Sequence, residues 1–75
     1  MPTLRENIKR AWREGCSTDA LLNLGRLVDK FRYSHGFTSE DTRQLFEDVT
    51  GEEITPAAWA ERLLEVDALG AVSIR

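Results

Sequence analysis

The sequence predicts an all-α fold, a compact four-helix small domain that ends in a short extended or β C-terminal tail. Three observations predict it. Apolar residues recur at helical spacing in four segments, each segment follows a Ser or Thr that can cap a helix, and a Gly stands after each segment. No linker or internal repeat divides the chain, so residues 1–75 form a single helical domain. The predicted helices are residues 4–14, 18–34, 39–50 and 56–69.

The first helix is predicted over residues 4–14. Thr3 and Glu6 have the spacing of a capping box, in which the Thr side chain caps the helix and the Glu side chain returns to the Thr amide. One apolar stripe follows at helical spacing, made of Leu4, Ile8, Ala11 and Trp12. Gly15 is the expected end of the helix.

The second helix, over residues 18–34, has Ser17 or Thr18 as its cap and Gly36 as its end. Its wide apolar face consists of Leu21, Leu24, Leu27, Val28 and Phe31. Gly25 interrupts this face. A Gly there costs about 1 kcal/mol relative to Ala, so it indicates a close crossing with another helix.

The third helix, over residues 39–50, begins at Thr38 or Ser39 and ends at Gly51. Glu40 and Asp41 suit the positive end of its dipole. Its apolar face is Leu45, Phe46 and Val49. These signals agree with one another and predict a helix of about three turns.

The fourth helix, over residues 56–69, opens with Thr55 as cap and Pro56 at the first helical position, where a missing N–H is harmless. Its apolar residues are Trp59, Leu63, Leu64 and Val66. Gly70 is the expected end. Val72 and Ile74 then alternate, which predicts a short strand that would pack as a tail or pair with a second chain.

Charge divides the sequence into two unequal halves. Residues 1–35 hold seven basic against four acidic residues, and residues 36–75 hold three basic against nine acidic ones, for a net charge of −3. Like-charge pairs occur at i,i+4 in the first helix (Arg5, Lys9 and Arg13) and in the fourth (Glu61 and Glu65), at a small cost in each helix. Three explanations remain open: the two helices complement each other, a basic partner meets the acidic half, or copies of the chain associate head to tail.

The sequence does not favour catalysis or a bound cofactor. Cys16 is the single cysteine and His35 the single histidine, so a Cys-based zinc cluster within one chain is excluded and a nucleophile–base pair is not indicated. We therefore expect a non-enzyme with no cofactor and no metal. The start, "MPTLRENIKR", lacks the apolar stretch of a signal peptide, and no apolar run is long enough to span a bilayer. A cytoplasmic protein that does not enter membranes is the expectation.

The last 40 residues have the pattern of a helix-turn-helix with a strand behind it, similar to a winged helix. The chemistry of the segment argues against DNA reading, because the start of the candidate recognition helix offers Ala57, Ala58, Ala60 and Glu61, with Arg62 as the one donor. Carboxylates around this segment would repel phosphates. If nucleic acid is bound, the better surface is the basic stripe of the first helix: Arg5, Lys9, Arg10 and Arg13.

The leading hypothesis is a non-catalytic protein–protein interaction module that acts as a small adaptor, regulator or inhibitor. It would meet a protein partner with a basic surface through an acidic helical surface, where the expected contacts are Glu47, Asp48, Glu52, Glu53, Glu61 and Glu65. The alternative is a helix-turn-helix DNA-binding regulator that dimerises through its tail. Either hypothesis is compatible with a homo-oligomer.

Overall fold

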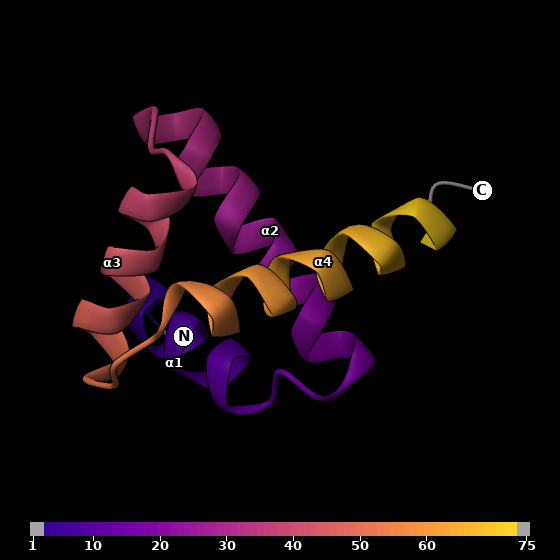
Figure 1. Ribbon diagram of the computed structural model, residues 1–75, viewed down its shortest axis with the longest axis horizontal. Helices are drawn as coiled ribbons and strands as arrows, with labels where there is room; N and C mark the ends of the chain where they lie inside the picture. The colour runs from indigo at the N-terminus through magenta and orange to yellow at the C-terminus, as the bar shows by residue number, and fades with distance from the viewer. Residues whose placement is uncertain (1–2, 74–75) are drawn as a thin grey trace.

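The computed structural model describes residues 3–73, with side chains given for residues 3–69, and it confirms the predicted all-α fold. Four helices make up this part of the chain: α1 (Leu4–Arg13), α2 (Thr18–His35), α3 (Ser39–Thr50) and α4 (Pro56–Ser73). Figure 1 shows α4 running across the molecule and over α2, with its C-terminal turns projecting beyond the other helices. The other three helices surround the start of α4.

The helix starts are set by the capping residues that the sequence indicated. Thr3 and Glu6 form the predicted capping box of α1, with both reciprocal bonds 3.2 Å long. Ser17 caps α2 by accepting from the Ala20 amide. Thr38 caps α3, and a second capping box there joins it to Asp41. These side chains satisfy amides that would otherwise lack partners at the helix starts.

The predicted helix ends hold in the middle of the chain and fail at its C-terminal end. Gly36 and Gly51 adopt the left-handed conformation, with φ of 64° and 72°, and end α2 and α3. Gly70, by contrast, is part of α4, which continues to Ser73. The predicted end at residue 69 and the start of the predicted strand are therefore wrong; Ile74 and Arg75 lie outside the described residues.

A simple physical reason explains this difference. A helix satisfies its own backbone hydrogen bonds, whereas a lone strand needs a pairing partner. Two alternating apolar residues are too weak a signal to overcome that advantage, and Gly ends a helix only where it takes a positive φ. The described residues contain no strand, so the winged-helix pattern is not realised in this part of the chain.

The core lies where α1, α2 and α3 meet the first turns of α4. Its most deeply buried apolar side chains are Ile8, Leu24, Phe46 and Ile54, each 1% exposed or less. Trp59 packs on Phe46 with ring centroids 5.0 Å apart. Ile54 belongs to the connection between α3 and α4, so its burial fixes the path of the chain into α4.

Gly25 lies where α2 crosses α4, as the sequence indicated. A Cβ atom at this position would lie 2.5 Å from Cγ1 of Val66. Since Val is branched at Cβ and has few rotamers, it has little freedom to move aside. The missing side chain of Gly25 therefore permits the close approach of α4 to α2.

None of the helices in the described residues combines the length and the apolar character that crossing a bilayer requires. The His, Cys, Asp and Glu side chains of the same residues form no group of three or more that could hold a metal ion.

Candidate functional site

The outer face of α4 is exposed along its length. We define this outer face by the exposed residues Ala57, Ala60, Glu61, Leu64, Glu65 and Ala68. Leu64 is 68% exposed, and carboxylates stand beside it at positions 61 and 65. The opposite side of the helix packs inwards through Trp59, Leu63 and Val66. The outer face thus offers one apolar side chain framed by two negative charges.

The six carboxylates expected at a partner surface fall into two groups. Glu61 and Glu65 lie on the outer face of α4, while Asp48 and Glu53 are exposed elsewhere, on α3 and in the following connection. Glu47 and Glu52 have partners inside the molecule, as described below. These two can bind a partner only if their hydrogen bonds inside the molecule break. The sequence therefore predicted more available carboxylates than the structure shows.

Glu47 belongs to a network centred on Arg43. Its Oε2 atom lies 3.1 Å from Nη1 of Arg43 and accepts a 2.8 Å hydrogen bond from the Ile54 amide. Arg43 also donates 2.6 Å to the Ile54 carbonyl and pairs with Glu40. The network therefore holds both polar backbone groups of buried Ile54, and it ties the end of the α3–α4 connection to α3.

The same network shifts two pKa values. The hydrogen bond from Arg43, aided by its positive charge, lowers the pKa of Glu40 below its usual 4.5. The reciprocal bond from Glu40 raises the pKa of Arg43 above its usual range. Both side chains are therefore charged at neutral pH, and they form an ion pair on the surface of α3.

Glu52 and Arg62 both engage Trp12. Oε2 of Glu52 accepts a 3.0 Å hydrogen bond from the indole Nε1 of Trp12. The guanidinium carbon of Arg62 lies 4.6 Å from the Trp12 ring centroid, in a cation–π contact. Trp59 stacks beside Trp12 with centroids 6.1 Å apart. This cluster links α1 to α4 and to the connection that precedes it, and among the described residues no ion pair joins α1 to α4.

Arg62 has a further constraint, at Gly15. A Cβ atom built on Gly15 would fall 1.1 Å from Nη1 of Arg62, so the guanidinium occupies the space that any larger residue would fill. Nη1 of Arg62 and Nε1 of Trp59 are buried without a hydrogen-bond partner. The one basic side chain near the start of α4 therefore points into the molecule and is not presented on the outer face.

That position bears on the DNA-reading alternative. A recognition helix reads bases with side chains near its N-terminus, and Arg62 was the one donor available there. Since Arg62 is held against Trp12 and Gly15, the start of α4 presents Ala57, Ala60 and Glu61. This surface lacks the donors that base edges require.

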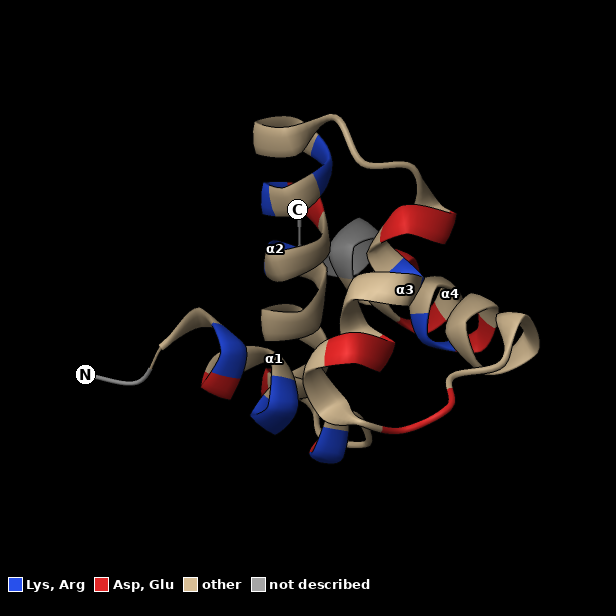
Figure 2. Ribbon diagram, turned by 90° about the vertical axis from the view of Figure 1, so that its left-hand side faces the viewer, with Lys and Arg blue, Asp and Glu red and all other residues tan. Residues whose placement is uncertain are grey.

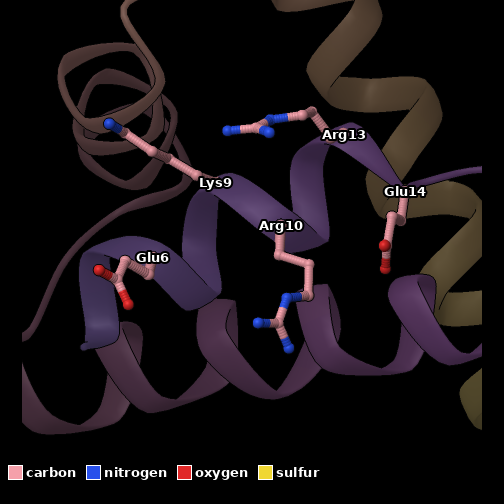
Figure 3. A pocket seen from close by; sticks show the side chains of 5 residues that line it. All are labelled: Glu6, Lys9, Arg10, Arg13 and Glu14. Carbon is pink, nitrogen blue, oxygen red and sulfur yellow. The ribbon is translucent and has the colours of Figure 1, made fainter. Parts of the chain in front are cut away.

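The basic side chains of α1 are free of internal ion pairs. Arg5, Lys9, Arg10 and Arg13 are exposed, and the ion pairs among residues 3–69 all involve Arg43. Internal complementation between α1 and α4, one of the three explanations for their like-charge pairs, is thus not made by ion pairs in the described part. In Figure 3, Lys9 and Arg13 extend to one side of α1 and Arg10 to the other.

Charge is also segregated in space. Figure 2 shows basic residues on α1 and α2, at the left of that view, and most acidic residues on α3, α4 and the connection between them. The sequence halves of opposite charge thus become surfaces of opposite charge. Such a molecule has a large electric dipole moment.

Cys16 precedes α2 and His35 is its last residue, so the two lie at opposite ends of that helix. Cys16 is exposed and has no disulfide, in the turn between α1 and α2. The His35 ring, at the end of α2, lies 5.3 Å from Phe31 and 5.6 Å from Phe37, measured between centroids. His35 therefore takes part in an aromatic cluster that covers one end of the core.

The described residues thus show four main features: the outer face of α4, the Arg43 network, the Trp12 cluster and the basic side of α1 and α2. Comparison with protein-family models, with curated proteins and with solved structures gives no match for this chain.

Proposed function

We propose that the protein is a non-catalytic interaction module, a small adaptor, regulator or inhibitor, that docks through the outer face of α4 on a basic surface of a protein partner. The observation that carries the proposal is Leu64, 68% exposed between Glu61 and Glu65. An exposed apolar anchor supplies affinity when a partner buries it, and flanking charges direct the approach.

The free state of the two carboxylates supports the same proposal. Glu61 and Glu65 repel each other across one helical turn. No cation from the described residues pairs with them, in contrast to Glu40 and Glu47. A partner that brings positive charge to this face removes the repulsion and so gains binding energy.

The proposal extends to the compartment. Cys16 is exposed and has no disulfide partner, and an exposed free thiol persists in the reducing cytoplasm. We therefore assign the module to the cytoplasm.

Capture from an extract of the cells that make the protein tests the proposal. The bait is compared with its Leu64→Ser and Glu61→Lys/Glu65→Lys variants, and with Tyr33→Ser as a matched control, because Tyr33 is 93% exposed but lies on α2. We expect a protein retained by the unchanged bait and by Tyr33→Ser, and retained about tenfold less by the two α4 variants. A set of captured proteins that is the same for all four baits would contradict the proposal.

Binding of nucleic acid through α1 is the second candidate, favoured by the exposed and unpaired cations Arg5, Lys9, Arg10 and Arg13. A gel-shift titration at low salt separates it from the first. Retardation that disappears in Lys9→Glu/Arg13→Glu and weakens steeply with added salt would favour nucleic acid. We expect no retardation, because the whole chain carries a net charge of −3.

A further inference from the structure

We infer that the basic surface met by the outer face of α4 is the groove between α1 and α2 of a second copy of this chain, so that copies associate head to tail. This inference rests on the proposed function, since it names the partner of the same face. Its support is a match in charge and apolar character between two surfaces that the structure describes.

The receiving surface is a groove of about 260 Å³ between α1 and α2. Its apolar members are Ala11, which is buried, and Leu27, which is half-buried. Exposed Arg10 and Arg26 stand at its rim, one from each helix. The remaining lining residues are Asn7, Glu14 and Asn23. The groove thus has an apolar floor between two arginines.

The outer face of α4 has the complementary arrangement. Leu64 is the apolar projection, and Glu61 and Glu65 flank it one helical turn apart, about 6 Å along the axis. Seated in the groove, Leu64 would contact half-buried Leu27 of the other copy, and the two carboxylates would meet Arg10 and Arg26. Arginine and carboxylate pair in a bidentate geometry that fixes orientation as well as charge.

Glu14 is the one carboxylate in the groove, and the two arginines outnumber it. Because Glu14 repels other carboxylates, Glu61 and Glu65 should lie near Arg10 and Arg26 and away from Glu14. Lys9 and Arg13, on the other side of α1 in Figure 3, add positive potential around the groove. The approach of an acidic helix is therefore favoured before contact.

The outer face of α4 cannot bind the groove of its own chain. The groove lies where α2 borders α1, at Asn23, Arg26 and Leu27, whereas α4 packs against α2 at Gly25. The outer face of α4 is turned away from α2 and cannot reach the groove of its own copy. Each copy thus offers one face and one groove, and such heterologous contacts build open chains or closed rings.

Sedimentation velocity of the purified chain at rising concentration, up to about 1 mM, tests the inference. Four designs are compared: the unchanged chain; Leu64→Asp, which removes the α4 face; Arg10→Glu/Arg26→Glu, which removes the groove; and a chain that exchanges the charges of both surfaces. All five altered positions are exposed, so circular dichroism should report the same helical fold for each.

We expect the average mass of the unchanged chain to rise with concentration beyond that of a dimer, and to fall back as salt is raised from about 0.05 to about 0.5 M. Each variant alone should stay monomeric. An equal mixture of the two variants should form a 1:1 complex that grows no further, because one partner supplies the intact face and the other the intact groove. A chain with Glu61→Lys/Glu65→Lys and Arg10→Glu/Arg26→Glu together should associate again.

Several results would overturn the inference: an unchanged chain that remains monomeric, growth that stops at a dimer, association that survives Arg10→Glu/Arg26→Glu, or variants that fail to complement. The proposed function is decided separately, by whether the bait retains any protein, its own chain included, through Leu64. A chain that is monomeric yet captures a partner through Leu64 would remove the head-to-tail assembly and leave the interaction module.

Discussion

Helices α3 and α4 use their carboxylates in different ways. In α3, Glu40 and Glu47 lie three and four residues from Arg43, on either side of it, and pair with it. In α4, Glu61 and Glu65 lie four residues apart beside an exposed leucine, and the cation between them in sequence, Arg62, is held against Trp12 and pairs with neither. In α3 the carboxylates are paired within the helix. In α4 the two carboxylates and the apolar side chain remain available to another molecule.

The difference separates charges that hold the fold from charges that are available for binding. The α3 network fixes the backbone of Ile54 and hence the entry into α4. The outer face of α4 contributes nothing comparable to the fold, because its side chains touch solvent. Changes in the first group should lower stability and leave binding intact, and changes in the second should do the reverse.

The largest effect on stability is expected at Gly25, on the inner side of α4. Gly25→Ala gains about 1 kcal/mol of helix propensity but places a methyl group against Val66, for a net loss of about 1–2 kcal/mol. Urea unfolding measures it. Ala60→Leu, a larger addition on the outer face, should change stability by less than about 0.5 kcal/mol.

A second substitution checks the cause of the loss at Gly25. If the contact with Val66 causes it, then Gly25→Ala combined with Val66→Ala should lose less than the sum of the two single changes. A stabilising Gly25→Ala, or strictly additive changes, would show that α2 and α4 do not meet closely at this point.

Arg43→Met is the next test, because it removes the donor that serves Glu40, Glu47 and the Ile54 carbonyl. We expect a clear fall in the urea midpoint and unchanged behaviour in the capture experiment. Lys9→Met removes an exposed, unpaired cation on α1 and is the matched control. Equal falls for both variants would mean that the Arg43 network adds no more to stability than an ordinary surface charge.

Glu52 and Glu53 form a matched pair of neighbours with a smaller expected difference. Glu52→Ala removes the acceptor of the Trp12 indole and should cost about 1 kcal/mol, with a change in tryptophan fluorescence. Glu53→Ala removes an exposed carboxylate and should leave both readouts unchanged. Reversal of this order would contradict the internal role of Glu52.

The smallest effect concerns pH. Because Arg43 lowers the pKa of Glu40 in the folded state, ionised Glu40 stabilises the protein fully above its usual pKa of 4.5. This stabilisation is lost as pH falls through the lower folded pKa. An NMR titration should find the Glu40 pKa below 4.5 in the unchanged chain and closer to 4.5 in Arg43→Met. A Glu40 pKa at or above 4.5 in the unchanged chain would contradict the pairing.

Local signals in the sequence were sufficient for most of the fold. The cap at Thr3 with its partner Glu6, the caps at Ser17 and Thr38, and the stops at Gly36 and Gly51 depend on neighbours within a few residues. Such signals can be recognised without knowledge of the tertiary structure. At Gly70 the same local reasoning failed, because the residues next to a Gly do not determine whether it takes a positive φ angle.

The candidate site was predictable only in part, because it depends on contacts between distant residues. Glu47 and Glu61 look alike in the sequence, yet one is paired with Arg43 and the other is exposed. The bond from Trp12 to Glu52 spans 40 positions. The burial of Ile54, in a connection between helices, likewise had no periodic signal. Which charges remain available becomes clear only after the helices are packed.

Site-specific photo-crosslinking in the cells that make the protein asks whether the outer face of α4 is where this molecule meets another. A photoreactive residue placed at Leu64 should give a discrete crosslinked protein, either another protein or a second copy of the chain. The same residue at Tyr33, which is exposed on α2, should not give that product. Crosslinks of equal pattern from both positions, or none from position 64, would contradict a docking role for this face.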